Sequence, residues 1–177
     1  MATGTIPLPV GAAILPDGSS GNAAPGISRI QGTEANPKKH LLGLAFDPST
    51  SEHAYWTFRM PTNYASGGVV NLLWQTNDVG AGEECVWAGK LIAVTAADAD
   101  TPQEHANTTE TTVTSGVNTT EANRLISAAI TLSAGSLDSV AAGDLVTLMI
   151  RRAVADAADD LTSDAVLLAV DFEYTTT

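Results

Sequence analysis

The chain has 177 residues, enough for one domain with a sizeable core, and its single cysteine, Cys85, excludes an internal disulfide framework. It carries 8 Lys and Arg residues against 20 Asp and Glu residues, a formal net charge of −12 that repels phosphate backbones, so we expect no nucleic-acid partner. No apolar run approaches the roughly 18 residues of a membrane span, and Met1 is not followed by a basic and then apolar leader, so we expect neither membrane insertion nor secretion by a signal peptide.

The first 37 residues differ in composition from the rest and predict an extended N-terminal arm over residues 1–37. Five of the eight prolines fall here, namely Pro7, Pro9, Pro16, Pro25 and Pro37. Proline and glycine at this density disfavour a regular helix and leave few residues to pair in a sheet. In an extended conformation Ile6, Leu8 and Val10 share one side. Two interpretations stay open: a disordered terminus, or an arm that becomes ordered against a neighbouring subunit.

From residue 38 onward, alternating apolar and polar residues bounded by turn residues predict a β domain over residues 38–177. The alternation is clearest at residues 53–60, where Ala54, Trp56 and Phe58 face one way. The eight candidate strands are 39–46, 53–60, 69–75, 84–94, 108–117, 125–132, 143–152 and 165–174. Eight strands in an all-β chain favour an antiparallel jelly-roll β-sandwich.

The last two candidate strands bracket an acidic loop and predict a closing β-hairpin of the sandwich. The loop carries Asp156, Asp159, Asp160 and Asp164. Several carboxylates in one loop can collect Ca²⁺, although the EF-hand spacing is missing here. The alternative is a solvated acidic turn whose charge is balanced by the adjacent pair of arginines at 151 and 152.

No residue pattern predicts a catalytic, cofactor-binding or metal site. His40, His53, His105 and Cys85 are the whole supply of zinc-type ligands, and their spacing fits no zinc motif. The G-x-S-x-G motif of hydrolytic nucleophiles is absent. A pair of carboxylates that converges in a cleft, as in glycosidases, is left open by the sequence.

The three tryptophans, Trp56, Trp74 and Trp87, fall on alternating positions of candidate strands, and we expect them in the core. The alternative is a sugar-stacking platform on a lectin-like sandwich. That alternative requires at least one of the three to be exposed.

Several short segments occur in a recognisable order along the chain. They are Trp56-Thr57-Phe58-Arg59-Met60-Pro61 with Tyr64, then Val70-Asn71-Leu72-Leu73-Trp74, then Glu84-Cys85-Val86-Trp87, and finally Gly143-Asp144 through Arg151, Asp156, Asp160, Asp164-Ala165 and Tyr174. In this order the chain resembles small jelly-roll structural proteins of tailed-phage virions, the group that includes capsid decoration or cement proteins and some tail-associated proteins. The resemblance covers residues 40–174 and leaves out the arm.

The resemblance implies a homotrimer without enzymatic activity or cofactor, which attaches to the outer surface of the major capsid protein lattice and reinforces it. The acidic balance agrees with an outward position in the virion, because an inward one faces packaged DNA. Under this hypothesis the arm anchors the protein to the capsid or to an adjacent protomer. The expected partner-binding residues are Ile6, Leu8, Val10, Ile14 and Leu15.

Two alternatives remain at this stage. The same sandwich can serve in the tail or baseplate as a structural or receptor-binding module, which requires an exposed aromatic or polar pocket. A carbohydrate-active enzyme on a β-sandwich requires two carboxylates about 5–10 Å apart in a cleft.

Overall fold

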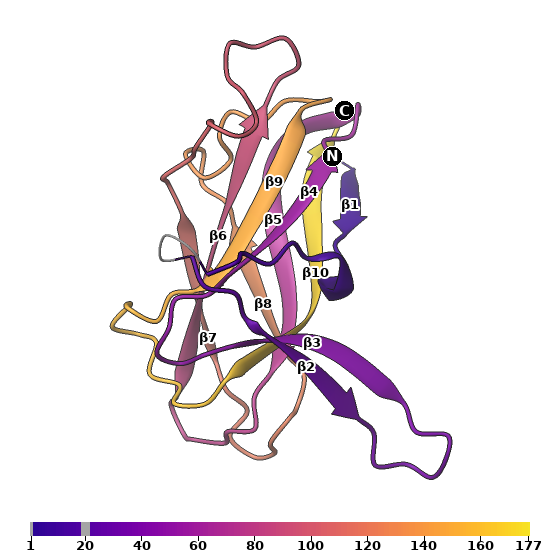
Figure 1. Cartoon of the computed structure of the whole chain (residues 1–177), viewed down its shortest axis with the longest axis vertical. Coiled ribbons are helices and arrows are strands. Elements are labelled where there is room, and N and C mark those ends of the chain that lie inside the picture. Colours follow the sequence, from indigo (N-terminus) through magenta and orange to yellow (C-terminus); the bar gives the residue numbers. More distant parts are fainter. Residues whose placement is uncertain (1, 19–21) are drawn as a thin grey trace.

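The computed structural model describes residues 2–18 and 22–177, which form a sandwich of two antiparallel β-sheets (Figure 1). Sheet A contains β1 (Thr3–Pro7), β2 (Gly26–Gln31), β3 (His40–Phe46), β5 (Tyr64–Gln75), β8 (Ile126–Thr131) and β10 (Ala165–Thr176). Sheet B contains β4 (His53–Arg59), β6 (Glu84–Val94), β7 (Thr111–Gly116) and β9 (Leu145–Arg152). The all-β jelly-roll sandwich expected from the sequence is confirmed. Within the described residues the one helical element is the 3-10 turn η1 (Val10–Ala12), and no helix there is long and apolar enough to cross a membrane.

Strand β10 organises sheet A, whose order is β2-β3-β10-β5-β8. One edge of β10 pairs with β5 along most of its length. The other edge is shared: residues 165–167 pair with β3, and residues 171–175 pair with β1. Sheet B has the order β4-β9-β6-β7. β5 and β10 are the longest strands, and they carry the centre of the sandwich.

The core lies between the two sheets because each strand turns alternate side chains inward. Trp87 is fully buried, with its ring centroid 5.1 Å from that of Phe46 and 5.9 Å from that of Trp74. Both contacts have the edge-to-face geometry that aromatic rings prefer. No tryptophan exceeds 2% exposure, so the prediction that all three belong to the core is confirmed.

Residues 2–14 close one side of the sandwich. β1 adds to the edge of β10, and the Leu8 N–H then donates to the Val170 carbonyl at 2.8 Å. Farther on, the Ile14 N–H donates to the Tyr55 carbonyl of β4 at 2.7 Å, which ties the segment to sheet B. Proline is tolerated here because an edge strand leaves half of its N–H groups without a ladder partner.

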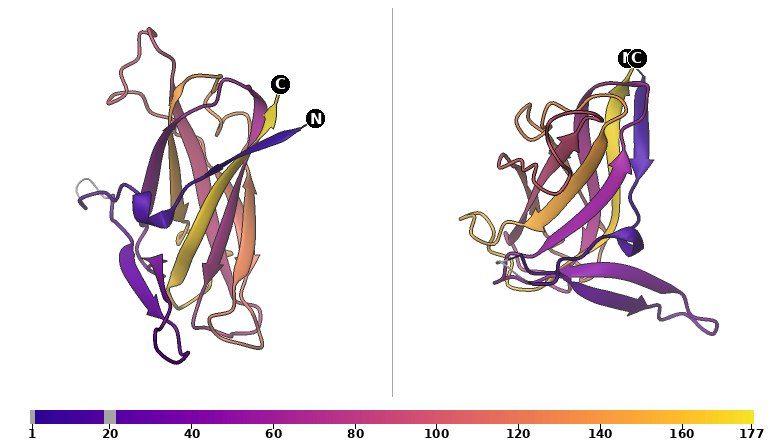
Figure 2. Two further views of the ribbon diagram at one scale, coloured as in Figure 1. Left: turned by 90° about the vertical axis from the view of Figure 1, so that its right-hand side faces the viewer. Right: turned by 45° about the horizontal axis from the view of Figure 1, so that its top comes forward.

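β2 and β3 form a hairpin that projects from the sandwich, as Figure 2 shows in two further views. All six residues of β2 pair with β3, but β3 pairs with β10 only through residues 44–46. The outer part of the hairpin, residues 28–43, is therefore a two-stranded ribbon without a third strand. The boundary expected between residues 37 and 38 falls in the turn of this hairpin, and positions 1 and 19–21 of the expected arm lie outside the described residues.

The closing hairpin expected from residues 143–174 is wrong. β9 lies in sheet B between β4 and β6, whereas β10 lies in sheet A, so the acidic loop crosses from one sheet to the other. Period-two alternation identifies strands but not their partners. The connection, residues 153–164, is longer than the 2–5 residues of tight hairpin loops.

Candidate interaction surfaces

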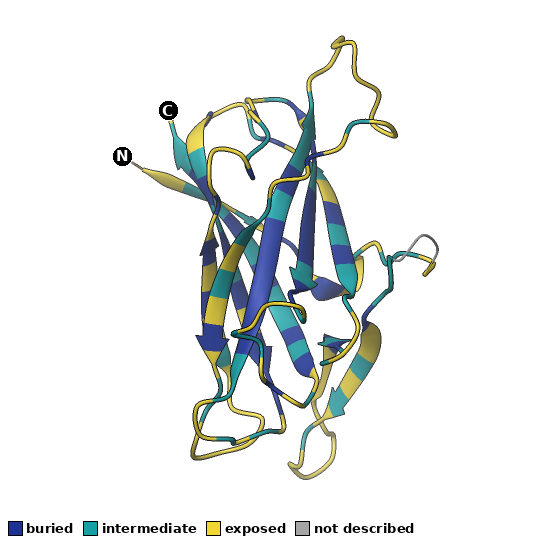
Figure 3. Ribbon diagram, turned by 90° about the vertical axis from the view of Figure 1, so that its left-hand side faces the viewer, coloured by how far each residue is buried: buried dark blue, intermediate teal, exposed yellow. Residues whose placement is uncertain are grey.

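The projecting hairpin exposes more large aliphatic surface than its two strands can bury. Ile27 is 65% exposed, Leu41 42% and Leu42 39%. Figure 3 shows the same region as a mixture of exposed and intermediate residues that contrasts with the buried strands of the body. A groove of about 750 Å³ separates one side of the hairpin from the ends of β5 and β10. The register places Ile27 and Leu42 on one face of the hairpin with Arg29, whereas Leu41 lies on the opposite face with Ile30. Exposed aliphatic side chains that share a face are typical of a surface that binds another molecule.

The hairpin is basic although the chain as a whole is acidic. Residues 26–46 hold Arg29, Lys38 and Lys39 and a single acid, Glu34, a formal charge of +2. The rest of the chain then has five basic and 19 acidic residues, a formal charge of −14. Within the described residues none of the three hairpin cations forms an ion pair, whereas Lys90, Arg124, Arg151 and Arg152 of the body all do.

Glu34 is engaged in the turn of the hairpin. Its Oε1 accepts a hydrogen bond from the Lys39 N–H at 2.7 Å. Its own backbone N–H and that of Lys39 lower the pKa of its carboxyl. The one acid of the hairpin therefore shapes the turn, and the cations remain available to a partner.

A second, smaller surface lies on the outer face of sheet B, where a cavity of about 350 Å³ is lined by polar side chains. Arg151 donates to Glu110 Oε2 through Nε at 2.9 Å and Nη2 at 2.7 Å, and Lys90 Nζ lies 3.5 Å from Glu110 Oε1. Burial alone would raise the pKa of Glu110, but the hydrogen bonds and charge of Arg151 lower it. Burial and the charge of Arg151 lower the pKa of His53, whose buried Nδ1 has no hydrogen-bond partner among the residues that the structure describes. Tyr55 lies beside His53 with the two rings nearly parallel.

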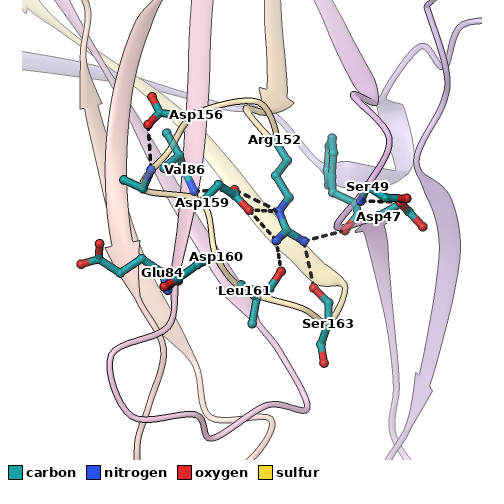
Figure 4. Close-up of polar contacts among 12 residues, drawn as sticks. Asp47, Ser49, Glu84, Val86, Arg152, Asp156, Asp159, Asp160, Leu161 and Ser163 are labelled. Carbon is teal, nitrogen blue, oxygen red and sulfur yellow. Dashed lines mark hydrogen bonds and ion pairs between the residues drawn. The ribbon is translucent and has the colours of Figure 1, made fainter.

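The acidic loop is held to the body by a buried ion pair, drawn in Figure 4. Arg152 is 0% exposed, and its Nη2 lies 2.7 Å from Oδ1 of Asp159, whose side chain is 2% exposed. Arg152 also donates to the carbonyls of Ser163, at 2.8 Å, and of Leu161. Asp159 Oδ2 accepts from the Val86 N–H at 2.8 Å. The loop is thus fixed across the end of the core.

This geometry accounts for two of the four aspartates that raised the possibility of calcium. Asp159 pairs with Arg152, and Asp160 Oδ1 accepts from the Glu84 N–H at 2.7 Å. Within residues 2–18 and 22–177, no three His, Cys, Asp or Glu side chains come together as metal ligands. Only part of the solvated-turn interpretation agrees with the structure. Arg152 does balance the negative charge of the loop, through Asp159, but the pair is buried. Arg151 pairs with Glu110 instead of with the loop.

One pair of carboxylates has opposed pKa shifts, as acid–base pairs often do. The Gly80 N–H and the Ser163 hydroxyl lower the pKa of Asp78. Burial and the nearby Asp78 raise the pKa of Glu83. Asp78 Oδ1 accepts from the N–H groups of Val79 and Gly80 at 2.7 and 2.9 Å, the pattern of an Asx turn. The shifts are therefore explained by the turn between β5 and β6.

The structure places most of the five expected partner-binding residues against the chain's own core. Leu8 and Val10 are 5% and 8% exposed, and Ile6 and Leu15 pack against the same core from its edge. The side chains of Leu8 and Val10 thus complete this sandwich, whereas Ile6 and Leu15 are only partly buried. Ile14 differs, with 55% of its surface exposed. Partner binding by these five residues stays a prediction.

The sequence analysis missed the hairpin residues because the whole segment up to residue 37 was interpreted as one arm. A weak signal was present between Gly26 and Gln31, where Ile27 and Ile30 are β-branched residues of the kind enriched in strands. A second signal was that three of the eight basic residues fall within positions 29–39.

Comparisons with known proteins concern the fold. No protein-family model matches the sequence, and a search of curated proteins gives no match either. Among solved structures, exo-β-1,3-galactanase from Phanerochaete chrysosporium, determined with galactose, is 10% identical with a TM-score of 0.48; the match covers 97% of this chain and 29% of the galactanase. CBM27-1 of Caldicellulosiruptor saccharolyticus, determined with mannohexaose, is 11% identical with a TM-score of 0.41 and covers 95% and 96% of the two chains. TmCBM61, determined with β-1,4-galactotriose, is 11% identical with a TM-score of 0.34 and covers 97% and 87%. The chain thus spans less than a third of the galactanase.

Proposed function

We propose that this protein is a non-enzymatic structural component of a tailed-phage virion, a decoration or cement protein that attaches to the outer surface of the major capsid protein lattice and stabilises it. The protein acts by docking rather than by chemistry. Its sandwich is the rigid body, and the β2–β3 hairpin is the element that reaches a neighbour.

The observation that carries the proposal is the unpartnered hairpin. Ile27, Leu41 and Leu42 keep between 39% and 65% of their surfaces in water, beside cations that have no ion-pair partner within the described residues. Burying one such aliphatic side chain is worth about 1.5–3 kcal/mol. A partner that covers Ile27 and Leu42, which share one face of the hairpin with Arg29, therefore gains appreciable affinity. A structural role also agrees with the polar side chains of the acidic loop and of the turn at Asp78. Asp159 and Asp78 accept hydrogen bonds from backbone N–H groups and so hold the chain's own loops in place.

The charge distribution supports the outer surface as the place of attachment. A body of formal charge −14 is repelled by packaged DNA and tolerated on the outside of a shell. The resemblance of residues 40–174 to virion structural proteins points the same way.

The test is electron cryomicroscopy and mass spectrometry of particles produced by the phage whose genome encodes this chain. We expect the chain in purified virions, with density for the two-sheet sandwich outside the shell and the hairpin against a neighbour. Absence of the chain from the particle, or turnover of a saccharide by the purified protein, would contradict the proposal.

A second candidate, a receptor-binding module of the tail or baseplate, is favoured by the polar cavity on sheet B. Lys90, His53 and Tyr55 line it, and they offer a cation, a histidine and a phenol ring to an anionic or sugar-like group. Under this hypothesis Lys90→Ala and Tyr55→Ala weaken adsorption of the purified chain to host cells, and a hairpin substitution such as Ile27→Ser does not. Unchanged adsorption by the cavity variants would exclude it.

A further inference from the structure

A wide face of this protein is complementary to the basic, apolar hairpin. It is the outer face of sheet A, formed by the outward residues of β1, β10, β5 and β8. The register places Glu173 between Thr5 and Val69, and Asp171 between Pro7 and Asn71. Because opposed residues of antiparallel strands lie on the same face, these side chains share one surface.

The composition of this face is acidic and mildly apolar. Asp171 and Glu173 have intermediate exposure, and no hydrogen bond or ion pair engages their carboxylates within the described residues. Leu73, which pairs in register with Ala169, is 38% exposed on the same face. The neighbouring β8 contributes Ser127, Ala129 and Thr131. The strand residues that face outward here include no lysine or arginine, and no described segment covers them.

We propose that the β2–β3 hairpin of one copy docks on the outer face of sheet A of a second copy. The cations Arg29, Lys38 and Lys39 then lie opposite Asp171 and Glu173. Ile27 and Leu42, on the same face of the hairpin as Arg29, cover Leu73 and the small side chains of β8. This contact deepens the proposed function by naming the partner of the hairpin, and it rests on that function only for its role on the capsid.

The proposed contact is heterologous, since the hairpin and the face are different surfaces of the same chain. Repetition of such a contact closes into a ring when the rotation between copies permits, and otherwise it extends into an open chain. A ring of copies linked by hairpins would reinforce a shell beneath it.

Charge complementarity selects a second copy over other occupants. Each copy has a hairpin of formal charge +2 and a body of formal charge −14. The hairpin of one copy is therefore attracted to the body of a second copy, while the two bodies repel each other. That attraction is screened by salt, because the Debye length falls from about 10 Å at 0.1 M to about 3 Å at 1 M.

The test is a charge swap followed by sedimentation velocity on the full chain, without any capsid. The wild type should sediment as an oligomer whose fraction rises with protein concentration. The dissociation constant of this oligomer should rise at least several-fold at high salt. The double variant Lys38→Glu/Lys39→Glu should be monomeric, and so should Asp171→Lys/Glu173→Lys. A mixture of the two variants should associate again, because each supplies the surface that the other lacks.

Arg124→Glu is the matched control. Arg124 is an exposed cation of the body, 57% exposed, and its reversal should leave association unchanged. Near-ultraviolet circular dichroism establishes that each variant is folded. A wild type that stays monomeric at every concentration, variants that associate like the wild type, or a mixture that stays monomeric would each overturn the inference.

Failure of this inference is distinct from failure of the proposed function. A chain that is found on the virion but does not self-associate through the hairpin overturns only the inference. A chain that self-associates as described but is absent from virions overturns only the proposed function.

Discussion

The buried ion pair between Arg152 and Asp159 should contribute more to stability than any other polar contact of the acidic loop. The variant Asp159→Asn preserves the shape of the side chain but leaves the guanidinium of Arg152, 0% exposed, without a counter-charge. Breaking one partner of a buried pair costs about 3–5 kcal/mol. Since whole domains are stable by about 5–15 kcal/mol, this is a large fraction of the total. In a chain of this size we expect the melting temperature to fall by about 6–20 °C.

Urea unfolding of four variants, namely Asp159→Asn, Asp156→Asn, Arg152→Met and the double variant Arg152→Met/Asp159→Asn, measures this prediction. Asp156→Asn is the matched control, because Asp156 is exposed and accepts only the Ala158 N–H, at 3.0 Å; we expect it to cost about 0.5 kcal/mol or less. In an Arg152→Met background, Asp159→Asn should cost less than in the wild type, with a coupling energy of about 1–3 kcal/mol. If Asp159→Asn unfolds at the same urea concentration as Asp156→Asn, the reasoning is refuted.

Three further predictions follow from individual side chains. Leu8→Ala should lower the free energy of unfolding of the isolated chain by about 2–5 kcal/mol, measured in urea. Ile14 is exposed, so Ile14→Ala should cost about 0.5 kcal/mol or less. Equal costs would mean that the N-terminal segment does not belong to the core. Hydrogen bonding to Asp138, with the charges of Asp138 and Asp100, raises the pKa of His105 above its ordinary 6.5. The contribution of the His105 imidazolium to stability is therefore fully present below pH 6.5 and is lost as the pH rises through the raised pKa. Melting curves across this pH range should show the loss in the wild type and not in His105→Gln. Burial raises the pKa of the Cys85 thiol, so a thiol-specific reagent at neutral pH should react with it only as fast as the chain unfolds, and rapid labelling of the native protein would count against its burial.

The strands of the body were predictable from sequence because their periodicity is strong. Residues 53–60 alternate over the whole strand, and residues 84–94 form a run rich in apolar residues on both faces. The structure places β4 and β6 within one residue of these ranges. β1 and β2 were not predicted. Their segments contain Pro7 and Gly26 and are only five and six residues long, too short for alternation to outweigh proline and glycine.

Pairing and surfaces were less accessible to sequence reasoning than strands were. The order of β9 and β10 along the chain does not tell which sheet each joins, and that depends on packing across the core. The burial of Leu8 and Val10 likewise depends on the open side of the sandwich between β10 and β4, a feature of the assembled fold. The same apolar alternation that predicted an external anchor thus serves the chain's own core.

The central claim is that the protein works by docking its β2–β3 hairpin on a neighbour. A two-stranded ribbon in water is marginally stable, so in the free chain the amides of residues 26–31 and 40–43 should exchange hydrogen rapidly compared with those of β5 and β10. Hydrogen–deuterium exchange with mass spectrometry, on the free chain at high dilution and on purified virions, compares the same peptides in the two states. We predict that the hairpin peptides become strongly protected in the virion. Hairpin peptides that exchange as fast in the virion as in the free chain, while another surface gains protection, would contradict this account.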